Sequence, residues 1–246
     1  MNKLRILLSI IFICLCVGVA NAQFPPFVKQ NDGRQAENAQ RVKRSISASY
    51  NKILANKGLN VAILQADKNE IEIITDGCSA DDVLTEVKDG VLNIKMKKVT
   101  KGSAVQVNVS LKDLDAIETK RGASISTECV FAHKGTFTVT VDAKSEVELE
   151  LDCENLVLES NSGVATLTGK VQNLKANLRG LVGDMSLNAE KLDAQDVDIN
   201  ALNVNATVKF ANSLKANVKC CTLNYIGDSS KVSATTSLGG KVLPVE

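Results

Sequence analysis

Apolar and polar residues alternate in short segments along almost the whole chain after about residue 45. In residues 69–74 and 91–96 every second residue is apolar, and Asp89-Gly90 stands just before the second segment. A period of two predicts half-buried β-strands. Asp-Gly between two such segments predicts a tight hairpin, because glycine accepts a positive φ. Only residues 79–85 could form a short helical turn, so we expect an all-β protein.

A loose repeat runs through the second half of the chain. Each copy has a leucine, then any residue, then alanine or leucine, and the segment at Phe137 fits as a further copy. From Leu156 onward the copies follow at steps of 18, 18 and 22 residues. A unit this short cannot bury its own apolar face, so the copies must stack on one another. The repeat predicts a β-solenoid, with its leucines at Leu114, Leu156, Leu174, Leu192 and Leu214.

A β-sandwich is the main alternative, because it also consists of short strands joined by frequent turns. Two features favour the solenoid. The repeat has the length of one solenoid rung, and aromatic residues make up only 3% of the chain, with no tryptophan. Asparagines are dense between residues 155 and 224, where a parallel stack would let them hydrogen-bond in columns.

The two ends of the chain suggest how it is divided. Residues 1–22 resemble a secretory signal peptide, with a basic start, an apolar stretch and the cleavage site Ala20-Asn21-Ala22. Cleavage would place a mature protein without a membrane span in the periplasm, on the outer surface or outside the cell. Residues 23–44 contain two prolines and end in Arg41-Val42-Lys43-Arg44, which predicts a flexible tether. Residues 45–246 would form the domain, with N-terminal strands and a hairpin in 45–112 and repeat rungs in 113–246.

Charge and cysteine content exclude some function classes. The formal net charge is +1 and falls to about −1 when Lys3 and Arg5 leave with the signal peptide. A nucleic-acid-binding protein would carry a basic excess, so we expect no nucleic-acid partner. Five cysteines remain after residue 22, an odd number without a CxxC pair, and we expect five free thiols. They are Cys78, Cys129, Cys153, Cys220 and Cys221.

Candidate chemistry is sparse. His133 is the single histidine, which removes most acid–base and metal schemes, and its turn-like surroundings predict a solvated side chain. No catalytic or cofactor motif is present, so we expect no enzyme activity and no cofactor. Asp193, Asp196 and Asp198 come nearest to the carboxylate pair that a polysaccharide-degrading enzyme needs, and Asp196 and Asp198 share one face of a strand. A solvated polar face is the simpler interpretation of these aspartates.

A row of acidic residues is the other candidate surface. These residues alternate with Val147, Leu149 and Leu151, so they share one outer strand face that could bind a divalent cation or a basic partner. The row repels itself, and we expect lysine or arginine on neighbouring rungs. The four acidic residues are Glu146, Glu148, Glu150 and Asp152.

The chain resembles a bacterial domain family described as "putative auto-transporter adhesin, head GIN domain". The resemblance lies in residues 61–65, in residues 85–94, in the leucine copies and in a closing motif that includes Leu238-Gly239-Gly240, and it covers about residues 46–242. It implies a right-handed parallel β-helix without established catalytic residues. We therefore expect a secreted, non-enzymatic, adhesin-like binding module of the cell envelope, with a glycan, an envelope polymer or another envelope protein as partner. The alternative is a carbohydrate-active enzyme on a β-helix scaffold.

Overall fold

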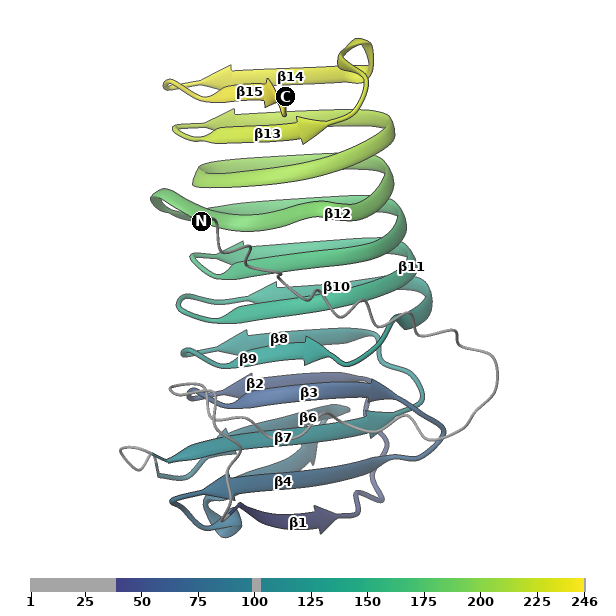
Figure 1. The fold of residues 1–246 in the computed structure, drawn as a ribbon, viewed down its shortest axis with the longest axis vertical. Coiled ribbons are helices and arrows are strands. Elements are labelled where there is room, and N and C mark those ends of the chain that lie inside the picture. Colours follow the sequence, from purple (N-terminus) through teal and green to yellow (C-terminus); the bar gives the residue numbers. More distant parts are fainter. Residues whose placement is uncertain (1–38, 99–102, 246) are drawn as a thin grey trace, which may run out of the picture.

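The computed structural model describes residues 39–98 and 103–245, and these residues form one mixed sheet of 15 strands that is strongly curled (Figure 1). The all-β prediction is confirmed. Helical structure in the described residues is limited to two three-residue 3-10 helices, η1 (Ala80–Asp82) and η2 (Ser229–Lys231). η1 lies in the segment predicted to form a helical turn, and Ser79 caps it by accepting a hydrogen bond from the backbone nitrogen of Asp81.

Antiparallel pairs occur in the N-terminal part of the sheet. β4 (Glu70–Asp76) lies between β1 (Gln40–Arg44) and β7 (Ala104–Leu111), and runs antiparallel to both. β5 (Val83–Lys88) and β6 (Val91–Met96) form an antiparallel hairpin. The predicted turn between them is confirmed, because Asp89 and Gly90 have φ values of 51° and 74°, as a tight primed turn requires.

Two further N-terminal strands connect this part to the repeat half. β2 (Lys52–Asn56) pairs in parallel with β6 and with β8 (Ala116–Lys120). β3 (Asn60–Gln65) pairs in parallel with β7 and with β9 (Ser124–Thr127). The N-terminal strands and the repeat half therefore share one sheet and one continuous core.

In the repeat half, neighbouring strands always pair in parallel. Leu156 is the register partner of both Phe137 and Leu174, so three predicted copies of the repeat do align. A sandwich of two facing antiparallel sheets does not form, because every strand belongs to the one sheet. The strands of this half are β10 (Phe131–Val141), β11 (Glu146–Asn161), β12 (Val164–Lys219), β13 (Thr222–Ile226), β14 (Val232–Ser237) and β15 (Lys241–Pro244).

The predicted 18-residue step from Leu174 to Leu192 is wrong as a register step. Asn200 donates a hydrogen bond to Asn177, a step of 23 residues, and Ser213 donates one to Asp196, a step of 17 residues. Leu192 lies 18 residues after Leu174 and is therefore not its register partner, although it is fully buried as predicted. The predicted hydrogen bonding between stacked asparagines is confirmed in two pairs. One is Asn177 and Asn200, and the other is Asn155 and Asn173, in which the amide nitrogen of Asn173 lies 2.9 Å from the amide oxygen of Asn155.

The step from Asn177 to Asn200 is longer than the 18-residue step before it, and its extra residues fall within 181–185. Gly180 still lies against Ser162, 18 residues earlier. The hydroxyl of Ser186 already donates to the carbonyl oxygen of Gly163, 23 residues earlier. Leu181 lies between these two contacts and is 70% exposed, so the insertion bulges into solvent and leaves the core alignment intact.

The core is a single, mostly aliphatic cluster that runs from Ile53 to Tyr225. Along the first half of β11 exposed and buried residues alternate strictly, so each second side chain enters this cluster. Leu174 is 2% exposed, and its neighbour Lys175 points outward and is exposed. No disulfide links the cysteines of the described residues, and Cys153 and Cys221 are buried.

The predicted tether at 23–44 is wrong at its C-terminal end. Residues 40–44 form β1, in which Arg41 contacts Glu72 and the guanidinium of Arg44 donates to the carbonyl oxygens of Val83 and Ala80 at 2.6 and 2.8 Å. The predicted signal peptide and residues 23–38 lie outside the described residues. Within the described ranges no helix is long and apolar enough to cross a membrane.

Candidate functional site

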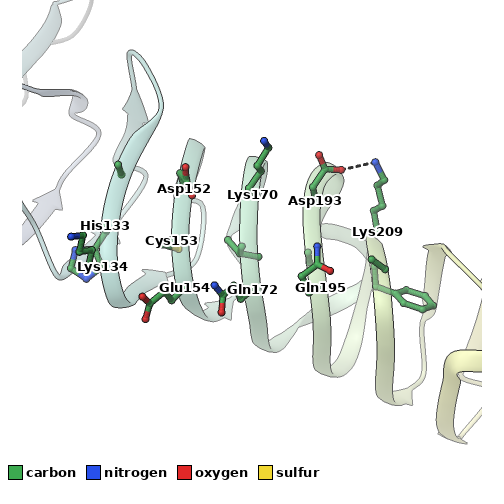
Figure 2. A pocket seen from close by; sticks show the side chains of 15 residues that line it. His133, Lys134, Asp152, Cys153, Glu154, Lys170, Gln172, Asp193, Gln195 and Lys209 are labelled. Carbon is green, nitrogen blue, oxygen red and sulfur yellow. Dashed lines mark hydrogen bonds and ion pairs between the residues drawn. The ribbon is translucent and has the colours of Figure 1, made fainter. Parts of the chain in front are cut away.

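A groove of about 800 Å³ crosses five successive passes of the chain in the repeat half (Figure 2). Each pass contributes three consecutive residues, of which the middle one is buried. The alternation of a strand explains this unit, because its two outer side chains leave the core while the middle one enters it. The five units are residues 132–134, 152–154, 170–172, 193–195 and 209–211.

Strand register places the units side by side. Asp152 on β11 is the partner of Ala132 on β10 and of Lys170 on β12. Cys153 is likewise the partner of His133 and of residue 171. Equivalent positions of successive passes therefore form rows along the groove, and Figure 2 shows Asp152 and Lys170 in such a row.

One row alternates in charge. Its side chains are Asp152, Lys170, Asp193 and Lys209, and the ammonium group of Lys209 lies 2.6 Å from a carboxylate oxygen of Asp193. The hydrogen bond from Lys209 lowers the pKa of Asp193, and the charges of Lys209 and Lys170 act in the same direction. Two carboxylates and two ammonium groups leave this row without net charge.

The opposite row carries one lysine, one glutamate and two glutamines, followed by an alanine. These residues are Lys134, Glu154, Gln172, Gln195 and Ala211. The floor between the rows includes Cys153 and Phe210, which are 6% and 4% exposed. Burial, and then the charge of Asp152, raise the pKa of Cys153 to about 11, so this thiol is protonated at neutral pH and is a poor nucleophile.

His133 lies at the end of the groove nearest the N-terminal strands. The expectation of a solvated side chain is wrong, because the residue is only 9% exposed. Its Nδ1 lies 2.9 Å from Oδ1 of Asp113, and its ring is 5.8 Å from that of Phe137 between centroids. The hydrogen bond with His133 is the largest cause of a lowered pKa at Asp113. The ring packs against the core on one side and meets carboxylates on the other.

The predicted acidic row is exposed along its whole length, but only Asp152 lines the groove. The expected lysine or arginine neighbours are found only there. Glu146 and Glu148 have Ser124 and Ser126 as register partners on β9, and the partners of the row on β12 include Thr166 and Thr168. Within the described strands, Glu146, Glu148 and Glu150 therefore have no basic register partner, and only Asp152 has one.

Asp196 and Asp198 lie outside the residues that line the groove. Asp196 accepts a hydrogen bond from Ser213, and Asp198 lies 3.9 Å from the ammonium group of Lys215. Both aspartates are half-buried and contact the following pass of the chain. Sequence reasoning named Asp152 and Asp193, which line the groove, but did not bring them together, because the units of the groove are far apart in the sequence.

Comparison with known proteins gives a family and a fold. The model of the family described as "Putative auto-transporter adhesin, head GIN domain" matches residues 49–228. A solved "putative adhesin" from Bacteroides fragilis NCTC 9343 is similar, with 18% identity, coverage of 85% of this chain and 98% of that chain, and a TM-score of 0.73. One from Parabacteroides distasonis ATCC 8503 has 21% identity, covers 84% and 97%, and has a TM-score of 0.60. No curated protein matches.

A third solved structure shows that names within this fold differ. It is a "putative lipid binding protein" from Parabacteroides distasonis ATCC 8503, with 19% identity, coverage of 85% and 98%, and a TM-score of 0.57. At these identities the likeness shows a shared fold, and a fold does not determine a ligand. The ligand must be argued from the side chains of this chain.

Proposed function

Since the chain belongs to the head GIN domain family, we propose that the mature protein is a secreted, non-enzymatic, adhesin-like binding module of the bacterial cell envelope, built as a right-handed parallel β-helix. The groove is its binding surface. A linear glycan of the envelope is the ligand that suits this surface best, ahead of another envelope polymer or protein.

The repetition of the groove carries this proposal. Five passes of the chain present the same unit of two outward side chains around a buried one. A surface with a regular repeat suits a ligand with a regular repeat, because each pass can make an equivalent contact. Gln172, Gln195 and the charged row offer hydrogen-bond donors and acceptors for hydroxyl groups. The neutral balance of the row favours an uncharged or zwitterionic chain over a polyanion.

The ionisation of the groove supports binding rather than hydrolysis. A glycosidase needs one carboxyl group whose pKa is raised, so that it can act as general acid. The pKa of Asp193 is lowered by Lys209 instead, and Asp152 has Lys170 as its register partner. The salt bridge between Asp193 and Lys209 holds both side chains in place, and they present fixed charges to a ligand.

Secretion is part of the proposal and has its own test. We expect cleavage after Ala22, so that the mature protein begins at Gln23. The intact mass of protein purified from the native envelope fraction measures this, and retention of residues 1–22 would contradict secretion.

Binding is tested with the mature chain on a glycan array, followed by titration calorimetry with the glycans that bind. Lys170→Ala and Gln172→Ala each remove an exposed side chain from the groove, and Lys191→Ala removes an exposed lysine of β12 that does not line it. We expect each groove variant to weaken binding about fivefold, because a net hydrogen bond contributes about 1 kcal/mol. Lys191→Ala should bind like the unaltered protein.

Two results would contradict the proposal. Equal affinities for Lys170→Ala, Gln172→Ala and Lys191→Ala would place the binding surface elsewhere. Depolymerisation of a bound polysaccharide that is lost in folded Asp196→Asn or Asp198→Asn would instead establish the enzyme alternative.

A further inference from the structure

Three side chains meet where the groove approaches the N-terminal strands. Asp113 and Asp115 lie in the segment between β7 and β8, and His133 lies on β10, which pairs in parallel with β8. One donor atom from each residue lies within 4.8 Å of the others. The cluster thus combines a buried imidazole with two exposed carboxylates.

The imidazole presents one nitrogen without a hydrogen bond. Nδ1 of His133 bonds Oδ1 of Asp113 at 2.9 Å, which favours the tautomer with its proton on Nδ1. Nε2 then carries a lone pair and faces Oδ1 of Asp115 at 4.0 Å, beyond hydrogen-bond distance. The His133 side chain is only 6% exposed. Among the described residues, Nε2 and Oδ1 of Asp115 thus face each other across a gap that no hydrogen bond closes.

The facing carboxylate is also held in place. Oδ2 of Asp115 accepts a hydrogen bond of 2.7 Å from the side-chain amide of Asn51. Its other oxygen, Oδ1, is the one that faces the imidazole. Asp113 receives a second hydrogen bond, from the backbone nitrogen of Leu114 at 2.9 Å, which fixes its own orientation. Each of the two facing atoms is therefore positioned by a partner behind it.

We propose that His133 and Asp115 bind a Zn²⁺ ion between Nε2 and Oδ1, with Asp113 and Asn51 orienting the two ligands and water completing the coordination. Zinc takes imidazole nitrogen at about 2.0–2.1 Å and carboxylate oxygen at about 2.0–2.2 Å. The 4.0 Å gap equals the sum of the two bonds in line, and a tetrahedral angle at the ion requires Oδ1 of Asp115 to move about 0.6 Å toward Nε2. A carboxylate on the far nitrogen of a ligating histidine is the usual support of such sites.

The imidazole ligand argues against calcium and magnesium. Imidazole suits zinc, copper and nickel, whereas calcium and magnesium take oxygen ligands. Because His133 also lines the groove, a bound ion adds positive charge at this end of the surface. The inference does not depend on glycan binding, since the cluster and the alternating row use different residues.

The experiment is calorimetric titration of the metal-free mature chain with Zn²⁺. We expect one ion per chain, and about 10–100-fold weaker binding for Asp115→Asn and Asp113→Ala, as for changes at or behind metal ligands. Asp115 is exposed, so Asp115→Asn should fold normally, which far-ultraviolet circular dichroism checks. Asp67→Asn changes an exposed aspartate of the β3–β4 loop and should leave zinc binding unaltered.

Thiols are the competing zinc ligands, and Cys153 is the register partner of His133. Cys153→Ser should retain zinc binding. Substitution with Co²⁺ should give a spectrum without a thiolate charge-transfer band. The proposal is overturned if the chain binds no zinc, if Asp115→Asn binds as tightly as Asp67→Asn, or if Cys153→Ser or thiol alkylation removes binding.

Discussion

Gly169 and Gly135 form a natural pair for testing how closely the passes of the chain are packed. Both have a φ of +99°, where an L-residue is strained. A Cβ at Gly169 would lie 2.1 Å from the carbonyl oxygen of Leu151 and 2.9 Å from its backbone nitrogen. A Cβ at Gly135 would meet nothing within 4 Å. The two alanine variants therefore share their backbone strain and differ in the steric contact.

The expected magnitudes follow from these two contributions. Alanine in the left-handed region costs about 1–2 kcal/mol at either position. Both substitutions also lower the conformational entropy of the unfolded chain, and this stabilising effect is the same for the two variants. At Gly169 the backbones must also separate by roughly 1 Å to reach ordinary contact. Overpacking of this kind costs about 1–3 kcal/mol. Gly169→Ala should therefore be less stable than Gly135→Ala by about 1–3 kcal/mol.

Urea denaturation followed by far-ultraviolet circular dichroism measures both variants, since the chain has no tryptophan to report unfolding. Leu151 and Gly169 are register partners one residue before Asp152 and Lys170. Gly169→Ala should consequently disturb the groove as well as the global stability. Equal unfolding midpoints for the two variants would refute the close approach of these two passes.

Three other predictions concern the core, an acidic residue and the thiols. Leu174→Asp should destabilise by several kcal/mol in urea denaturation, and Lys175→Asp should change stability by less than about 0.5 kcal/mol; the reverse ranking would mean that the faces are assigned wrongly. Burial, and then the charge of Glu148, raise the pKa of Glu128, so the unaltered protein loses stability as pH rises through that pKa. Glu128→Gln should therefore raise the melting temperature at about pH 7 and have little effect below the unfolded pKa of glutamate, about 4.3; equal effects at both pH values would contradict this. Thiol titration of the denatured mature chain should count five, with Cys153 reacting last in the native protein; a count of one or three would reveal disulfides.

The sequence pattern predicted those parts of the fold that depend on neighbouring residues. Alternation and the Asp89-Gly90 turn are local, and the structure has the strands and the hairpin where they indicate. The β1 strand could not be found in this way. Its single apolar residue, Val42, gives no period, and its partner β4 lies about thirty residues later in the chain. A strand that is fixed by ion pairs to a distant strand resembles a polar tether in sequence.

Register was the limiting unknown for the site. A bulge in solvent adds residues without disturbing the core, because surface connections tolerate insertions. The exposed residues around Leu181 shift every later side chain relative to an even repeat. Under even spacing Lys170 would lie beside Asn188, and the alternating row would not appear. With the observed step it lies beside Asp193, and charges of opposite sign meet.

The same dependence on register explains why His133 was expected to be solvated. Its own neighbours, Ala132, Lys134 and Gly135, are those of a surface turn. The ring packs against Phe137 on the same strand, and it bonds Asp113, which belongs to the preceding pass of the chain. A histidine in a stacked structure takes its environment from residues about twenty positions away. Its chemistry therefore depends on the passes above and below it, and a search for candidate sites in such chains should compare residues one repeat apart before it compares neighbours.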